Sequence, residues 1–285
     1  MAFTVPIWFL NEIELYKTVK PYRLDFEPED DDFPRTNVER VEVPNVPILD
    51  IRTYGKQLRF PECGFSILPM PLELTVLPYD DEQSVIDQYY PYLERVAQDF
   101  SSSFKKGAKA VALDHKVRKR HADFPVSTGE NYTHPQPVMV AHVDWTPESI
   151  GKKLRDKLGD EKAESIQKGH YQFCHAWKPI IGPLTEYPLA MCDFSSVDPE
   201  TDYELCDDVH MNHGVDENYL VYNRPGHKWY YISNQEPTEI LFFREYDSEI
   251  GFRSGTPHCA VQNPIPVENS TPRQSIEVEM VIYWE

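Results

Sequence analysis

The stretch that says most about the fold is Val138-Met139-Val140-Ala141-His142-Val143-Asp144-Trp145-Thr146. Its first residues are apolar and partly β-branched, which is typical of a strand. Side chains two residues apart on a strand lie on the same face. His142 and Asp144 are therefore predicted to point the same way, with an imidazole nitrogen and a carboxylate oxygen close enough to share a metal ion.

A third ligand from a distant strand would complete the two-histidine, one-carboxylate set of non-haem Fe(II) oxygenases. The same spacing recurs at His121 and Asp123, so the pair alone is weak evidence. That second pair follows a basic run in a polar stretch, where a buried metal would be hard to hold. The context favours His142 and Asp144, and the alternative is a histidine at a strand end that bonds a neighbouring carboxylate.

A second informative stretch lies downstream, where Arg273-Gln274-Ser275 follows His258 by fifteen residues and opens the last predicted strand. Arg273 and Ser275 share a face, so a guanidinium fork and a hydroxyl can bind one carboxylate together. A metal-binding histidine on one strand and an arginine on the next can hold a dicarboxylate cosubstrate by its two ends. The alternating apolar residues of this strand, which put Arg273 on the opposite face, are Ile276, Val278, Met280, Ile282 and Trp284.

The rest of the chain reads mainly as short strands bounded by turn residues. The predicted strands are Ala108–Leu113, Pro137–Trp145, Phe173–Trp177, Leu189–Asp193, Tyr219–Tyr222, Trp229–Ser233, Glu239–Phe243 and Ser275–Trp284. Helices are predicted over 82–101, where Pro91 should kink or split the helix, and over 147–169, which Gly159 should break. This order predicts a two-sheet roll or barrel with helices on one outer face. No linker divides the chain, so a single domain over residues 1–285 is expected.

The amino-acid composition excludes some classes of function. The 285 residues carry 28 Lys and Arg against 47 Asp and Glu, a net charge of −19 that argues against nucleic-acid or membrane-surface binding. No apolar run reaches the length of a membrane helix, and the N-terminal segment lacks the basic start of a signal peptide. The five cysteines are an odd number without CxxC spacing. Free thiols in a reducing compartment, the cytoplasm, are therefore expected.

Several segments, spread in order over almost the whole chain, are similar to those of one known protein family. The segments are Pro34-Arg35-Thr36-Asn37, Asp114-His115-Lys116-Val117-Arg118-Lys119-Arg120, Ala141-His142-Val143-Asp144-Trp145-Thr146-Pro147, Ala176-Trp177-Lys178-Pro179, Gly182-Pro183, Pro188-Leu189-Ala190-Met191-Cys192-Asp193, His227-Lys228-Trp229-Tyr230-Tyr231, Glu245-Tyr246-Asp247-Ser248 and Pro272-Arg273-Gln274-Ser275-Ile276-Glu277-Val278. They resemble the fungal AsaB-type hydroxylase/desaturase family, whose members are described as gibberellin-desaturase-like or cephem-methoxylase-related. The resemblance implies a mainly β fold with flanking helices, the double-stranded β-helix or jelly roll.

The resemblance also implies the cofactors Fe(II) and 2-oxoglutarate. By position, His142, Asp144 and His258 become the iron ligands, and Arg273 with Ser275 becomes the 2-oxoglutarate anchor. Lys178 stands where the family is expected to carry arginine, and it is a candidate for another contact to the carboxylate. Glu279 likewise stands where an arginine often follows in the family.

The function that follows is an oxygenase of a small organic metabolite in secondary metabolism. It would use O₂ and hydroxylate, desaturate or cyclise its substrate, and the sequence leaves open whether it forms a homo-oligomer. Two alternatives remain. A zinc-dependent hydrolase or isomerase could use the same three ligands without needing Arg273, and a non-catalytic jelly-roll binding protein would hold no stoichiometric iron.

Four other histidines have no partner at ligand spacing and are predicted to be structural. They are His115, His170, His175 and His227.

Overall fold

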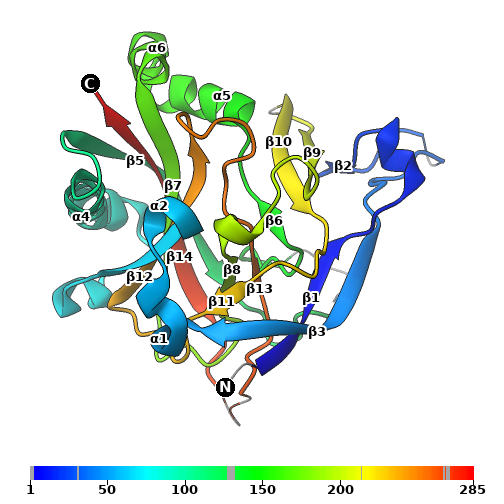
Figure 1. The fold of residues 1–285 in the computed structure, drawn as a ribbon, viewed down its shortest axis with the longest axis horizontal. Helices are drawn as coiled ribbons and strands as arrows, with labels where there is room; N and C mark the ends of the chain where they lie inside the picture. Colours follow the sequence, from blue (N-terminus) through cyan, green and yellow to red (C-terminus); the bar gives the residue numbers. More distant parts are fainter. Residues whose placement is uncertain (1–2, 31, 127–131, 213, 266, 268–269) are drawn as a thin grey trace.

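The computed structural model describes residues 3–30, 32–126, 132–212, 214–265, 267 and 270–285. Within these ranges the strands form two sheets (Figure 1). The five-stranded sheet contains, in spatial order, β4 (Phe65–Pro69), β12 (Glu239–Asp247), β7 (His170–Pro179), β14 (Gln274–Trp284) and β5 (Ala108–Lys119). The nine-stranded sheet contains β1 (Phe3–Leu10), β3 (Arg40–Asp50), β11 (Trp229–Tyr231), β8 (Leu189–Cys192), β13 (His258–Ala260), β6 (His142–Val143), β10 (Gly214–Val221), β9 (Tyr203–His210) and β2 (Tyr22–Leu24).

From β5 onward the chain passes from one sheet to the other at most steps. β5, β7, β12 and β14 belong to the five-stranded sheet, whereas β6, β8, β11 and β13 belong to the nine-stranded one. All pairs in the five-stranded sheet are antiparallel. Two sheets that share alternate segments of the chain are the arrangement of a jelly roll, as predicted.

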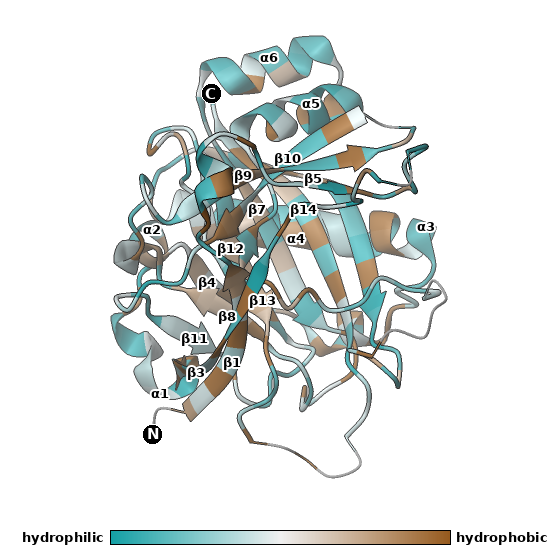
Figure 2. Cartoon of the chain, turned by 90° about the vertical axis from the view of Figure 1, so that its right-hand side faces the viewer, coloured by the Kyte–Doolittle hydropathy of each residue, from teal (hydrophilic) through white to brown (hydrophobic). Residues whose placement is uncertain are grey.

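β14 shows how the sequence sets the two faces of the five-stranded sheet. Ile276, Val278 and Met280 are buried in a cluster that also contains Leu93 and Ala97 of the helix α4 (Tyr90–Ser102). The residues between them therefore face the opposite way, into the roll. Figure 2 shows the same change of hydropathy from residue to residue along these strands. The predicted orientation of this strand is confirmed.

Both predicted helical windows are helical. The first contains α3 (Glu82–Ser84), the π-helical η4 (Val85–Tyr89) and α4, and Pro91 lies in the first turn of α4. The wider π turn precedes the residue that cannot donate a backbone hydrogen bond. The second contains α5 (Pro147–Leu158) and α6 (Asp160–Lys168), green at the top of Figure 1. Gly159 separates them with φ +79°, so the expected break is confirmed.

Other helical segments are short. They are η1 (Glu14–Lys17), α1 (Ile51–Tyr54), η2 (Gly55–Gln57), α2 (Phe60–Cys63), η3 (Leu72–Val76) and η5 (Phe194–Ser196).

Several strand predictions differ from the structure. The strand expected over residues 137–145 is regular only at His142–Val143, and the strands β1, β2, β3, β4 and β9 were not predicted. Pro6 and Pro44 interrupt the alternation in β1 and β3, and both lie at the register shift between the two strands. A β-bulge tolerates a residue without a backbone donor. These prolines therefore mark an irregular strand pair rather than loops.

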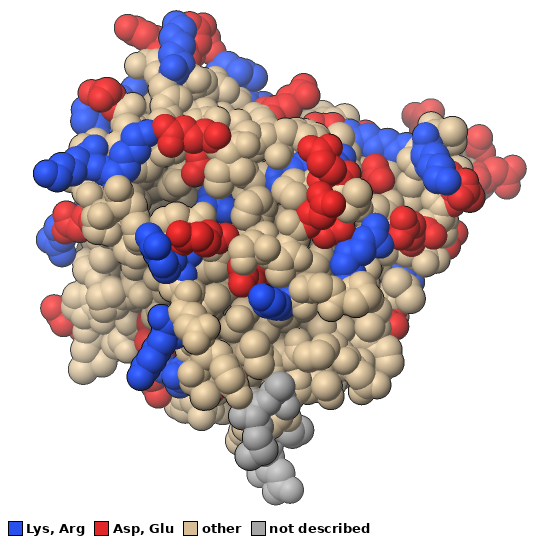
Figure 3. All heavy atoms as spheres, viewed as in Figure 1, with Lys and Arg blue, Asp and Glu red and all other residues tan. Residues whose placement is uncertain are grey.

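The surface carries charges of both signs. On the face drawn in Figure 3, acidic and basic side chains are interspersed, with acidic groups in excess near the upper right. None of the described helices has the length and apolar character needed to span a membrane.

Candidate metal centre

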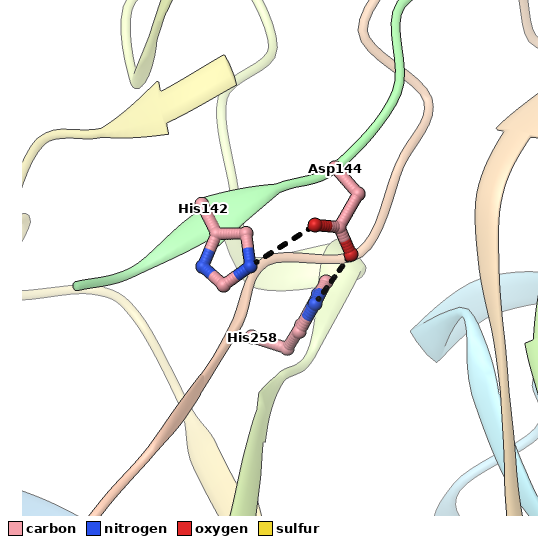
Figure 4. Close-up of side chains that lie close together, drawn as sticks. All are labelled: His142, Asp144 and His258. Atoms are coloured by element: carbon pink, nitrogen blue, oxygen red, sulfur yellow. Dashed lines mark hydrogen bonds and ion pairs between the residues drawn. The ribbon is translucent and has the colours of Figure 1, made fainter. Parts of the chain in front are cut away.

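The two predicted histidine ligands meet because their strands are neighbours. His142 on β6 pairs directly with His258 on β13, and their ring centroids are 4.5 Å apart. Asp144 follows β6 and points to the same side as His142, as the two-residue spacing predicts. The Nε2 atoms of His142 and His258 lie 3.3 Å and 3.2 Å from the two Asp144 oxygens (Figure 4).

Backbone carbonyls fix the tautomer of both imidazoles. Nδ1 of His142 lies 2.7 Å from the Val140 carbonyl, and Nδ1 of His258 lies 3.1 Å from the Thr256 carbonyl. A carbonyl oxygen only accepts, so each Nδ1 carries the proton and donates it. Each Nε2 is then the ring nitrogen that can bind either a second proton or a metal ion, and both Nε2 atoms are turned toward Asp144. Metal-ligating histidines are oriented by this kind of bond from the other ring nitrogen.

The charges at this site favour a cation. Burial alone would raise the pKa of Asp144, but His142 and His258 outweigh it and hold that pKa well below its ordinary value. Burial alone would lower the pKa of His258, yet the hydrogen bond and charge of Asp144 raise it. The carboxylate is therefore ionised, and a cation placed between it and the two Nε2 atoms would replace the proton that it attracts.

The geometry of the three donors fits a divalent metal. Nitrogen and oxygen ligands lie about 2.0–2.2 Å from such an ion, which places neighbouring donors about 3 Å apart in a facial arrangement. The observed separations from Asp144 are close to this value. Two imidazoles and one carboxylate also leave coordination positions open for other ligands. The structure thus brings together all three predicted ligands.

The predicted anchor residue Arg273 is buried directly before β14, with 3% of its surface exposed. Its guanidinium lies 5.0 Å from the Trp177 ring and donates to the Tyr187 carbonyl at 2.7 Å and to the Ser275 hydroxyl at 3.3 Å. Burial, and to a lesser extent the charge of Arg118, lower the pKa of Arg273 to about 9. No carboxylate of the described residues lies within 4.0 Å of this guanidinium. A buried cation without a close carboxylate is suited to receive an anionic ligand.

Lys178 does not belong to this site, and its prediction as a contact for 2-oxoglutarate is wrong. It pairs with Ile276 across β7 and β14, so both point to the outer face of the sheet. There its ammonium lies 4.2 Å from the Tyr79 ring and 5.8 Å from the Tyr89 ring. Arg273 is on the inner side, so the two cations are separated by the sheet.

Below pH 7 we expect Lys178→Met to raise the free energy of unfolding, by at most a few kcal/mol. Burial lowers the pKa of Lys178 from 10.5 to about 7. Between these pH values the unfolded chain binds more protons than the folded one, so the wild-type free energy of unfolding rises with pH. The advantage of methionine is therefore largest below pH 7 and is lost as the pH rises toward 10.5. Urea unfolding of both proteins at pH 6.5 and pH 9.5 measures this, and an equal difference at both values would contradict it.

Sequence reasoning missed three residues that surround Asp144 from the inner face of the five-stranded sheet. Glu245 on β12 accepts a hydrogen bond from the backbone N–H of Asp144 at 2.9 Å. His175 on β7 lies with Nδ1 3.5 Å from Asp144 Oδ2, although it was predicted to be merely structural. Glu277 on β14 lies 3.9 Å from His175. Only Glu277 had a signal in the sequence, because it shares the face of Arg273 and Ser275.

A jelly roll that carries two histidines and an aspartate on its short strands, with a buried arginine at its last strand, defines the class of Fe(II)/2-oxoglutarate-dependent oxidoreductases. The chain belongs to the family described as oxidoreductase/YMDC permease-like domain, whose model matches residues 8–283.

Individual relatives agree with this class. The chain is 28% identical over 260 residues to the hydroxylase/desaturase efuI of Hormonema carpetanum, covering 84% of this chain and 83% of that one. It is 26% identical over 211 residues to the gibberellin cluster GA4 desaturase of Gibberella fujikuroi, covering 65% and 60%. The solved structure of the iron and alpha-ketoglutarate-dependent endoperoxidase NvfI superposes with a TM-score of 0.81 at 19% identity, covering 99% of this chain and 98% of that one. The expected family resemblance and the jelly-roll fold are confirmed.

Proposed function

We propose that this protein is an Fe(II)/2-oxoglutarate-dependent dioxygenase of a small organic metabolite, with His142, Asp144 and His258 as its iron ligands. The observation that carries the proposal is the convergence of two Nε2 atoms on one ionised carboxylate, with both ring orientations fixed by backbone carbonyls. The relatives that are named as hydroxylase/desaturase and GA4 desaturase support the same chemistry.

Arg273 and Ser275 bind the distal carboxylate of 2-oxoglutarate in this proposal. The guanidinium is already oriented by the Tyr187 carbonyl and the Trp177 ring, so little ordering is required when the anion arrives. Bound iron, together with 2-oxoglutarate and O₂, supplies the oxidising power for a C–H bond. The residues of this chain position the ligands, and the outcome would be hydroxylation, desaturation or ring closure.

The exposure of the ligands indicates how the substrate and O₂ reach the metal. The side chain of His258 is 2% exposed, whereas that of Asp144 is 27% exposed. We therefore infer that the substrate approaches from the Asp144 side, with the strand β13 closing the other. The five cysteines are all free and buried, which supports a reducing compartment and, we propose, the cytoplasm.

The proposal is tested by succinate formation after anaerobic reconstitution with Fe(II). We expect one equivalent of succinate per 2-oxoglutarate consumed, with no product when Fe(II), O₂ or 2-oxoglutarate is omitted. A panel of candidate metabolites should raise this rate when the correct substrate is added. Turnover of a metabolite by Zn(II)-loaded protein without 2-oxoglutarate would instead identify a hydrolase or isomerase. A protein that takes up no iron would be a binding protein.

A further inference from the structure

A second group of metal-type ligands lies directly behind the proposed iron site. The ligand atoms of Asp144, His175 and Glu277 all lie within 4.8 Å of one another. Nδ1 of His175 is 3.5 Å from Asp144 Oδ2, 3.7 Å from Glu245 Oε1 and 3.9 Å from Glu277 Oε2. Three carboxylates from different segments thus converge on one imidazole.

His175 is the informative member of this group because it has no hydrogen-bond partner. Its side chain is 1% exposed, and among the described residues neither Nδ1 nor Nε2 has a hydrogen-bond partner. Glu245 Oε1, which faces it, also has none. Buried polar side chains are almost always hydrogen-bonded. An imidazole and a carboxylate oxygen that face each other without a bond indicate that something belongs between them.

The distances match a metal ion better than direct hydrogen bonds. Hydrogen bonds between nitrogen and oxygen span 2.7–3.2 Å, and all three separations from His175 exceed this range. Donors that lie 2.0–2.2 Å from one tetrahedral ion are about 3.3–3.6 Å from each other. The distances from His175 Nδ1 to Asp144 and Glu245 are close to this donor–donor distance. A small movement of Glu277 would bring its carboxylate within reach of the same ion.

We propose that Asp144 bridges two metal ions, the second of which is a divalent cation held by His175 and Glu277 with Glu245 beside it. Asp144 can reach both ions, because Oδ1 faces His142 and Oδ2 faces both His258 and His175. Ions that share ligands in this way typically lie about 3.5–4 Å apart. This site goes beyond the proposed function, which requires a single iron.

The donor set indicates the class of ion. Carboxylate oxygens and one imidazole nitrogen suit Mn(II), Fe(II) or Zn(II), whereas a soft ion such as Cu(I) would require sulfur. Positive charge is also scarce here: among the described residues, Arg118 is the one lysine or arginine within 4.0 Å of these carboxylates. It lies 3.9 Å from Glu277 Oε1, so Oε2 is left facing His175. A second divalent ion would compensate the remaining negative charge.

The alternative occupant of this cluster is a proton. Burial, followed by the charges of Asp144 and Glu277, raises the pKa of Glu245 well above its ordinary value. A protonated Glu245 would also reduce the repulsion among these carboxylates without any second ion. The two arrangements differ in the number of metal ions that the folded chain binds, which can be counted directly.

The test is anaerobic equilibrium dialysis of the full chain against Mn(II), with bound metal measured by mass spectrometry and by electron paramagnetic resonance. We expect two Mn(II) per wild-type chain, with a spectrum broadened by coupling between neighbouring ions. Glu277→Gln and His175→Gln should each bind one ion and give an uncoupled spectrum. Glu279→Gln is the matched control, because this next inward-facing glutamate of β14 is paired to Lys153 at 2.7 Å. It should still bind two.

The outcomes separate this inference from the proposed function. One ion in the wild type that is lost in His142→Ala but kept in Glu277→Gln would overturn the second site and leave the iron site intact. No bound ion at all would overturn both. Two ions in the wild type and in both cluster variants would overturn the assignment to His175 and Glu277. If His175→Gln does not fold, the isosteric Glu277→Gln decides the question alone.

Discussion

Asp144→Ala is expected to lower Fe(II) binding to background and to abolish succinate formation. Asp144 is the one charged ligand of the triad, and both histidine Nε2 atoms are turned toward it. Loss of a group that only supports a ligand typically costs about 10–100-fold in metal affinity, so loss of the ligand itself should cost more than about 100-fold. Bound iron per chain after anaerobic dialysis and the rate of succinate formation measure the two effects.

The matched control is Asp123→Ala, which removes the aspartate of the other His-x-Asp pair. His121 and Asp123 are 3.6 Å apart, but their side chains are 47% and 65% exposed. This variant should retain wild-type iron content and activity. His142→Ala and His258→Ala should lose catalytic iron as Asp144→Ala does. Wild-type iron content in Asp144→Ala would show that the metal is held elsewhere.

The parts of this site that could be predicted from the sequence depend on local geometry. His142 and Asp144 share a face because they are two residues apart, and the same rule places Arg273 and Ser275 together. Neither inference requires knowing which strands are neighbours. The pairing of His258 with His142 does require that knowledge, and the sequence indicated His258 only by its place before Arg273 and by the family resemblance.

The same rule explains the error at Lys178. Lys178 directly follows Trp177, whose ring lies against the Arg273 guanidinium, and consecutive residues on a strand point to opposite faces. Alternation along β7 therefore excludes Lys178 once Trp177 is known to face inward. The place of Lys178 in a family segment therefore predicted its contacts less well than its position in the alternation of the strand.

The grouping of His175, Glu245 and Glu277 could not be found from the sequence for a different reason, although Glu277 shares the face of Arg273 and Ser275. They lie on β7, β12 and β14, and their proximity arises only when these strands pair with β7 in the middle. No spacing in the chain links positions 175, 245 and 277. A cluster assembled from neighbouring strands of one sheet therefore becomes visible only in the folded structure.

Arg273→Ala is expected to keep its iron but to bind 2-oxoglutarate roughly 10–100-fold more weakly. A hydrogen bond to a charged group contributes about 1.5–3 kcal/mol, and each 1.4 kcal/mol corresponds to a tenfold change in Kd. The guanidinium is not a metal ligand, so iron content should not change. Anaerobic isothermal titration calorimetry of the Fe(II)-loaded protein with 2-oxoglutarate measures Kd, while metal analysis of the same samples measures iron.

Arg273→Lys separates the effect of charge from that of shape. An ammonium restores the positive charge but has no planar fork to bind both oxygens of a carboxylate, so it should recover only part of the affinity. Lys178→Met serves as the control because that buried cation lies on the outer face of the sheet, and its Kd for 2-oxoglutarate should equal that of the wild type. Weak binding in Lys178→Met together with wild-type binding in Arg273→Ala would contradict the assignment of the anchor. An unchanged Kd in all three variants would mean that the distal carboxylate is held by other residues of the roll.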